Sequence, residues 1–320
     1  MANDDIVFTS NAAVRGSVGG HGVFAGGSGN VTFEEDSAFV LSVYPGKVMG
    51  GITSIYGICA AGNVIVNDSN IKVDIAIDPS IYYTDYEGLY GVYGVRAHGG
   101  RIEVNNCLSF AVNITSSTYL YDDEMIIGSI YGLHAQDVLA SGSSLNVKVE
   151  VPCGVNITGV KAAGIQLINE STLRSNTIGC GEVFGVDVRD VSDADHDGMH
   201  VHQSALHTSA NYPSQAPAWA KGVCIALVCG FFDLSVPSYG LLHLETENGD
   251  AALAVILGTS RTPISPEADY VATKLIENGH EPKTEATINH ATFLSGSTYV
   301  EYESYFTTDL SSVCKELLIY

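Results

Sequence analysis

The chain has 320 residues, of which 36 are acidic and 14 basic, and its formal net charge is −22. This acidity excludes a protein that binds the phosphate backbone of DNA or RNA, and it disfavours binding to an anionic membrane surface. Apolar residues make up 46% of the chain and charged residues only 16%, so the chain folds, and its 34 glycines are typical of β-structure with many turns.

The sequence leaves the cellular location open. Its most apolar run, residues 222–234, is shorter than the roughly 18 to 20 residues that a membrane-spanning helix needs. The start, Met1 to Asp5, lacks the basic and apolar regions of a secretory signal. Seven cysteines with no Cys-x-x-Cys motif do not indicate a disulfide framework. A cytoplasmic and an exported protein are both compatible with these features, and we expect no membrane span.

A five-residue unit, x-Gly-aliphatic-x-small, repeats along most of the chain. Its copies begin at His21, Tyr56, Tyr93, Tyr131, Thr158, Phe184, Lys221 and Tyr239. The early copies are followed by two more alternating runs, as in residues 62–66 and 71–77, with Gly, Asn or Asp turns between them. Three strands in roughly 22 to 27 residues form one coil of a parallel β-solenoid. We therefore predict an all-β fold of about eight coils, and the absence of a six-residue period favours a right-handed one.

Stacking the copies predicts which side chains face the core. The position after the glycine is always aliphatic: Val23, Ile58, Val95, Leu133, Val160, Val186, Val223 and Leu241. Two residues later the position is small or aliphatic in all copies but the last. Because the faces of a strand alternate, both positions should point inward. The mixed position between them should point outward; it holds Phe24, Cys59, Arg96, His134, Lys161, Asp187, Cys224 and Leu242.

This pattern resembles the right-handed parallel β-helix of pectate-lyase-like proteins. The repeated Tyr-Gly-aliphatic-x-Ala, followed by Gly-x-aliphatic-x-aliphatic, is most similar to passenger domains of bacterial autotransporters and related adhesins. The resemblance covers residues 16–257 and implies a β-helix domain over 1–257 with a C-terminal cap over 258–320. It also implies a cell-surface or secreted protein. It implies no single activity, because the same solenoid occurs in lyases, hydrolases, phage tail spikes and adhesins.

Three long segments are predicted as insertions before a new coil, all along one edge of the solenoid: 78–92, 116–129 and 190–220. The first two are rich in tyrosine and carboxylate residues, which suit sugars because a ring stacks on a pyranose and an acid accepts hydroxyl hydrogen bonds. The candidate ligand-binding residues are Tyr82, Tyr83, Asp85, Tyr86, Tyr90, Tyr119, Tyr121, Asp122 and Asp123. The alternative is that these tyrosines only pack the loops against the solenoid.

The outward residues Arg96, His134, Lys161 and Asp187 are the alternative, catalytic candidates. On neighbouring coils they should form one polar row about 14 Å long. The resemblance to polysaccharide lyases implies an Arg or Lys base and Ca²⁺-binding acids on this face. The other interpretation is a solvated face of alternating charges.

The segment from Asp193 to Gly198 matches the first half of an EF-hand-type calcium loop, with Asp193, Asp195 and Asp197 as ligands. Ser204 stands where the bidentate glutamate belongs, so the site is incomplete without a carboxylate from elsewhere. We expect no cofactor except Ca²⁺ at this loop, and the alternative is a solvated acidic loop.

These features predict a non-enzymatic, adhesin-like β-helix that binds glycans or a surface protein. Sequence motifs of serine hydrolases, P-loop proteins and zinc proteases do not occur. The competing hypotheses are a Ca²⁺-dependent polysaccharide lyase or glycoside hydrolase, and a purely structural solenoid. The tail from Gly258 leaves the repeat and should cap the open strand edges at the solenoid's end. The oligomeric state stays open.

Overall fold

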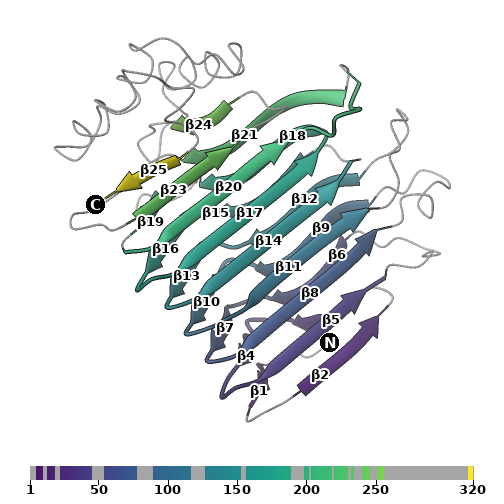
Figure 1. Cartoon of the computed structure of the whole chain (residues 1–320). Coiled ribbons are helices and arrows are strands. Elements are labelled where there is room, and N and C mark those ends of the chain that lie inside the picture. Colours follow the sequence, from purple (N-terminus) through teal and green to yellow (C-terminus); the bar gives the residue numbers. More distant parts are fainter. Residues whose placement is uncertain are drawn as a thin grey trace.

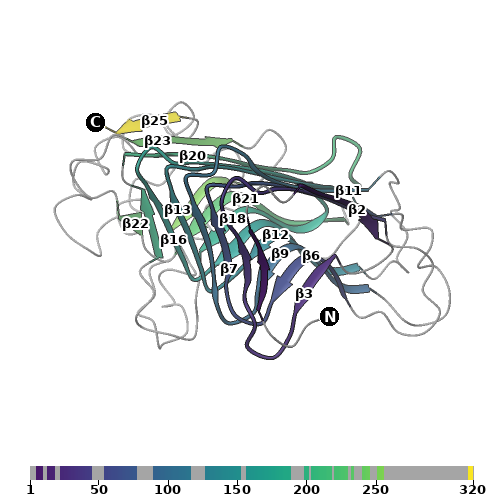
Figure 2. The same ribbon diagram turned by 90° about the horizontal axis from the view of Figure 1, so that it is seen from below.

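The computed structural model describes residues 5–9, 13–18, 22–44, 54–77, 89–116, 127–152, 156–188, 198–201, 203–217, 220–229, 232–233, 240–245, 251–255 and 316–319. These residues form short strands that stack along one axis (Figure 1). Seen from below in Figure 2, the chain passes in turn through three sheets that surround a common interior. The three sheets are named A, B and C in the order in which each coil visits them.

The strands of each sheet follow one another at every third place in the chain. Sheet A contains β3 (Val23–Ala25), β6 (Ser54–Ala60), β9 (Leu89–Ala97), β12 (Ile127–His134), β15 (Asn156–Ala162), β18 (Gly181–Val188), β21 (Lys221–Cys229) and β24 (Ala251–Val255). Sheet B contains β1 (Ile6–Phe8), β4 (Val31–Phe33), β7 (Val64–Asn67), β10 (Arg101–Asn105), β13 (Asp137–Ser141), β16 (Gly164–Ile168), β19 (Gly198–Val201) and β22 (Phe232–Asp233). Sheet C contains β2 (Ala13–Val18), β5 (Ala38–Val43), β8 (Asn70–Ile77), β11 (Phe110–Ser116), β14 (Ser144–Val151), β17 (Thr172–Gly179), β20 (Ala205–Asn211), β23 (Gly240–Glu245) and β25 (Glu316–Ile319).

This topology confirms the predicted parallel β-helix with three strands per coil. It has about seven coils, where the sequence predicts about eight. The first coil runs through β3, β4 and β5, and the last through β21, β22 and β23. The solenoid also begins earlier than residue 16, because β1 pairs with β4 and β2 with β5.

The interior is built from the aliphatic positions that the repeat predicts. Ile58, Val95, Leu133 and Val160 are fully buried, as are the matching residues of sheets B and C. At the N-terminal end the core holds three aromatic rings, Phe8, Phe33 and Phe39, with Phe8 and Phe33 stacked at 4.8 Å between centroids. These large rings fill the end of the solenoid core that lies next to β1.

In the units on β6, β9, β12, β15 and β18, the glycine lies within the sheet A strand, at a position where a Cβ would point at sheet C side chains such as Val112. A Cβ on Gly94 would lie 2.6 Å from the carbonyl oxygen of Gly132, and one on Gly132 would lie 2.5 Å from that of Gly159. Real Cβ atoms do not approach backbone that closely, so a side chain at these positions would push the coils apart. The glycines therefore hold the spacing between coils, which explains why the unit repeats them.

The sequence predicts the wrong position in the fold for the last two copies of the unit, those that begin at Lys221 and Tyr239. In β21 the partner of Val186 is Leu227, and Val183 pairs with Cys224 after a bulge. The residue that stacks on Gly185 in the next coil is therefore Ala226 and not Gly222. The Ala226 carbonyl lies where the carbonyl of the next unit's glycine lies in the earlier coils. The copy at Tyr239 belongs to β23 in sheet C, where Leu241 pairs with Ala205.

The predicted insertion 190–220 is also wrong, because it contains β19 and β20, which are the second and third strands of an ordinary coil. Neither strand is among the copies of the Gly unit, so the repeat does not indicate them. The connections 78–88 and 117–126 do lie between sheet C and sheet A strands, as predicted, and 45–53 is a third long connection at the same corner.

A ladder of buried serines supports the turns from sheet B to sheet C. At these turns the residue before the serine has a positive φ, as at Asp68 (49°) and Gly142 (58°). The backbone N–H of Cys107 donates to the Ser143 hydroxyl at 3.0 Å, and that of Ser143 donates to the Ser171 hydroxyl at 3.2 Å. Each hydroxyl thereby satisfies an amide at a bend where strand pairing is interrupted.

We expect Ser143→Ala to lower the free energy of unfolding by about 2 kcal/mol, because it leaves the buried N–H of Cys107 without its acceptor. Urea unfolding followed by circular dichroism measures the change. Ser144→Ala is the matched control, since Ser144 is the next residue and is exposed. Equal effects of the two substitutions would contradict a role for the ladder.

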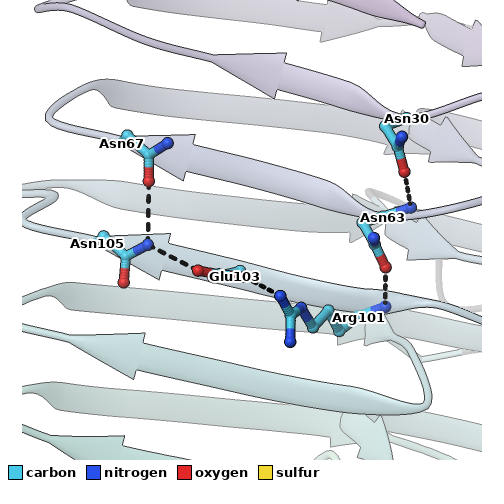
Figure 3. Close-up of polar contacts among 6 residues, drawn as sticks. All are labelled: Asn30, Asn63, Asn67, Arg101, Glu103 and Asn105. Carbon is cyan, nitrogen blue, oxygen red and sulfur yellow. Dashed lines mark hydrogen bonds and ion pairs between the residues drawn. The ribbon is translucent and has the colours of Figure 1, made fainter.

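Asparagine side chains extend strand pairing into the other turns (Figure 3). At the turn into sheet B, Asn30 Oδ1 accepts the backbone N–H of Asn63 at 2.7 Å, and Asn63 Oδ1 accepts that of Arg101 at 2.9 Å. At the far end of the strands, Asn105 Nδ2 donates to Asn67 Oδ1 and to Glu103 Oε1, both at 3.0 Å. Three of these bonds join consecutive coils, and the Asn105–Glu103 bond holds the Asn105 side chain within β10.

Strand β25 is the described part of the tail. It pairs antiparallel with β23, from Gly240 opposite Ile319 to His243 opposite Glu316. It therefore covers the edge of the last sheet C strand, and the expected helix and strands between residues 266 and 305 lie outside the described residues. The described part of the chain contains no helix that could span a membrane.

Candidate functional site

The outer face of sheet A gathers the polar side chains that the repeat places between its two core positions. Arg96, His134, Lys161 and Asp187 are register partners on β9, β12, β15 and β18. The row is not a uniformly solvated face, however. Asp187 is only 3% exposed, and Arg96, His134 and Lys161 are partly buried.

A column of tyrosines runs beside this row. Tyr56 and Tyr93 are stacked with 5.1 Å between ring centroids, and Tyr93 and Tyr131 with 5.4 Å. They are the first residues of their units and are register partners on β6, β9 and β12. The sequence shows their recurrence but does not assign them to the site. We call Tyr56, Tyr93, Arg96, His98, Tyr131 and His134 together the aromatic strip.

Arg96 is held by the tyrosines and by a histidine. Its Nη1 donates to Tyr56 Oη at 3.2 Å, and its Nη2 donates to His98 Nδ1 at 2.8 Å. Its guanidinium carbon lies 4.4 Å from the centroid of the Tyr93 ring, within the range of a cation–π interaction. Burial raises the pKa of the Tyr93 hydroxyl, with the charge of Arg96 acting against it. The guanidinium is thus fixed in orientation while retaining further N–H groups.

His134 lies against two tyrosine rings, 4.7 Å from that of Tyr131 and 5.6 Å from that of Tyr93. Its Nδ1 is buried and has no hydrogen-bond partner among the described residues. Burial, followed by the positive charges of Arg96, Lys161 and His98, lowers the pKa of His134 from 6.5 to about 4. The imidazole is therefore neutral at pH 7.

Lys161 and Asp187 form an ion pair at the end of the row. Lys161 Nζ lies 2.8 Å from Asp187 Oδ2, and the two side chains are 26% and 5% exposed. The Lys161 ammonium is engaged by a buried carboxylate, and the ion pair fixes both side chains on the face of sheet A. These two predicted catalytic candidates therefore have a clear structural role.

Exposure of the outer face falls along sheet A. On β18 and β21 the outward residues Phe184, Asp187, Ile225 and Val228 are at most 8% exposed. On β6, β9 and β12 the three tyrosines of the strip and Arg96 are partly exposed. Among the described residues of this face, the aromatic strip therefore offers the largest accessible group of neighbouring polar and aromatic side chains.

Most of the predicted ligand-binding and metal residues lie outside the described part of the chain. This holds for Tyr82, Tyr83, Asp85, Tyr86, Tyr119, Tyr121, Asp122 and Asp123, and for Asp193, Asp195 and Asp197. Tyr90 lies on β9, but its side chain is outside the description. In sequence, the segments that carry the candidate tyrosines lead directly into β9 and β12, the strands that carry most of the strip.

Among the described residues, no three His, Cys, Asp or Glu side chains form a group that could hold a metal ion. Five cysteines in the described part of the chain are buried and form no disulfide there: Cys59, Cys107, Cys180, Cys224 and Cys229. Burial raises the pKa of the Cys59, Cys107 and Cys180 thiols to about 11. Such thiols are protonated at pH 7 and pack as small apolar side chains.

Comparisons of the chain with protein-family models, with curated proteins and with solved structures found no match. The assignment that the structure supports is therefore architectural, namely a parallel β-helix with an aromatic strip on sheet A.

Proposed function

We propose that the protein is a non-enzymatic, adhesin-like β-helix that binds glycans at a cell surface or after secretion. The observation that carries this proposal is the aromatic strip, which places three tyrosine hydroxyls, one arginine and two histidines on consecutive coils of one partly exposed face. Hydroxyl, guanidinium and imidazole groups provide the hydrogen bonds that orient a sugar.

The geometry also indicates which contacts to a sugar the strip would make and which would come from other tyrosines. The faces of Tyr93 are already stacked against Tyr56 and Tyr131, so within the column a sugar would contact hydroxyl groups and Arg96 rather than ring faces. Ring faces for stacking on a pyranose would come from the loop tyrosines of segments 78–88 and 117–126, such as Tyr83 and Tyr121. The likeness of the repeat to autotransporter passengers supports the same function by analogy only.

A glycan array followed by titration calorimetry with the best binder tests the proposal. We expect Arg96→Gln to weaken binding at least tenfold, because it removes charge-assisted hydrogen bonds from the strip. Arg174→Gln is the matched control, because Arg174 is exposed on β17 in sheet C, and it should leave the affinity unchanged. An array without binders would overturn the proposal, and so would a best binder whose affinity is unchanged in Arg96→Gln, Tyr83→Ala and Tyr121→Ala.

A further inference from the structure

His134 occupies a place that disfavours its protonated form. Its ring is stacked on Tyr93 and Tyr131, and its register partners on either side are the cations Arg96 and Lys161. His98, which is hydrogen-bonded to Arg96, adds a further titratable group. The carboxylate nearest along the row, Asp187, forms an ion pair with Lys161, and no described carboxylate forms an ion pair with His134. A proton on His134 would therefore meet positive charge on both sides.

We propose that His134 makes the aromatic strip acid-labile, so that the strip is closed and ordered at neutral pH and opens in mildly acidic solution. In an open arrangement the imidazole leaves the tyrosine stack and is hydrated, and it can then accept a proton without facing two fixed cations. The buried Nδ1 that has no described partner makes leaving the stack easier, because no hydrogen bond of that atom is lost.

The direction of the pH effect follows from linkage. In the closed strip the pKa of His134 is about 4, whereas a hydrated imidazole titrates near 6.5. Between these values the open form binds more protons than the closed form, so the closed strip loses stability as the pH falls from 6.5 toward 4. The ratio of open to closed strip should rise about 20-fold between pH 7 and pH 5, since each full unit between the two pKa values contributes close to a factor of ten.

This inference rests in part on the proposed function, because opening the strip would release a glycan bound there. The opening itself has a readout that needs no ligand. Hydroxyl-radical footprinting with mass spectrometry reports the solvent access of Tyr93 and Tyr131 at pH 7 and at pH 5. Tyr212, which is buried in the core at 3% exposure, reports unfolding of the whole solenoid in the same sample.

The expected result is increased labelling of Tyr93 and Tyr131 at pH 5 with unchanged labelling of Tyr212. His134→Gln should remove the pH dependence, because glutamine takes up no proton. His207→Gln, on the outer face of β20 in sheet C, should behave like the wild type. The proposal is overturned if His134→Gln keeps the same pH dependence, or if labelling of all three tyrosines rises together.

Calorimetry with the array's best glycan at pH 7 and pH 5 separates this inference from the proposed function. Weaker binding at pH 5 in the wild type, but not in His134→Gln, supports both. Binding that is equal at the two pH values overturns the acid lability and leaves the glycan function intact. If no glycan binds at pH 7, the proposed function fails, while the footprinting result still decides whether the strip opens.

Discussion

Gly132→Ala should lower the free energy of unfolding by about 3 kcal/mol or more, which is among the largest losses expected from adding a single methyl group. The new Cβ would lie 2.5 Å from the carbonyl oxygen of Gly159 and closer still to Val147 Cγ1. The first of these atoms is backbone of the next coil, and the second belongs to a fully buried valine. The carbonyl cannot move without separating the coils, and the valine has little room to move in the packed core, so the steric cost exceeds the small gain from a less flexible unfolded chain.

Gly99→Ala is the control that separates steric crowding from glycine's conformational freedom. Gly99 has a φ of 82°, but nothing lies within 4 Å of the Cβ that alanine would add. Gly99→Ala should lower the free energy of unfolding by about 1 kcal/mol through backbone strain alone. Thermal and urea unfolding of both variants measure the difference. A loss at Gly132 no larger than that at Gly99 would show that the glycine column does not set the spacing of the coils.

Lys161→Met should lower the free energy of unfolding by about 3 kcal/mol, because it leaves the carboxylate of Asp187 buried without its ion-pair partner. Urea unfolding at pH 7 measures this loss in the free energy of unfolding.

The double variant Lys161→Met with Asp187→Asn should regain most of the stability lost in the single variant, since no charge is then buried. Lys148→Met is the matched control: Lys148 also pairs with a carboxylate, that of Glu150, but both side chains are more than a third exposed. It should cost less than about 1 kcal/mol. If the single variant is as stable as this control, the pair is not a structural element of the face, and the interpretation of Lys161 as a catalytic base would have to be considered again.

The coil pattern could be predicted because burial depends on local alternation. Ile58, Val95 and Leu133 follow a glycine at each turn of the repeat, and an aliphatic side chain recurring at one position of a strand has to face the core. The end of the repeat could not be placed in the same way. Both Gly222-Val223 and Ala226-Leu227 fit the pattern, and only pairing with β18 selects the second.

The site was predicted in part, for a similar reason. Arg96 and His134 were correctly placed side by side, because they follow the core positions by simple alternation. Tyr56 was missed. Two residues before the inward Ile58, strict alternation would put it in the core. In the fold, Gly57 and Ile58 both face inward, and Tyr56 stacks on Tyr93 on the outer face. At the glycine the alternation of inward and outward residues shifts by one position. The residue types in the unit do not indicate this shift.

The sequence by itself determined the class of fold, its three strands per coil and the identity of most core positions, because these depend on which residues alternate along a single strand. Only the tertiary structure decided where the solenoid's last copies lie, which outward residues share a face, and that Asp187 is buried while the aromatic strip is partly open. Those properties depend on neighbours about a coil away in the chain, and a residue's exposure is a property of what packs over it. The charge of −22 leads us to expect no nucleic acid partner; the structure adds a cationic and aromatic strip, centred on Arg96, on the surface of this acidic protein.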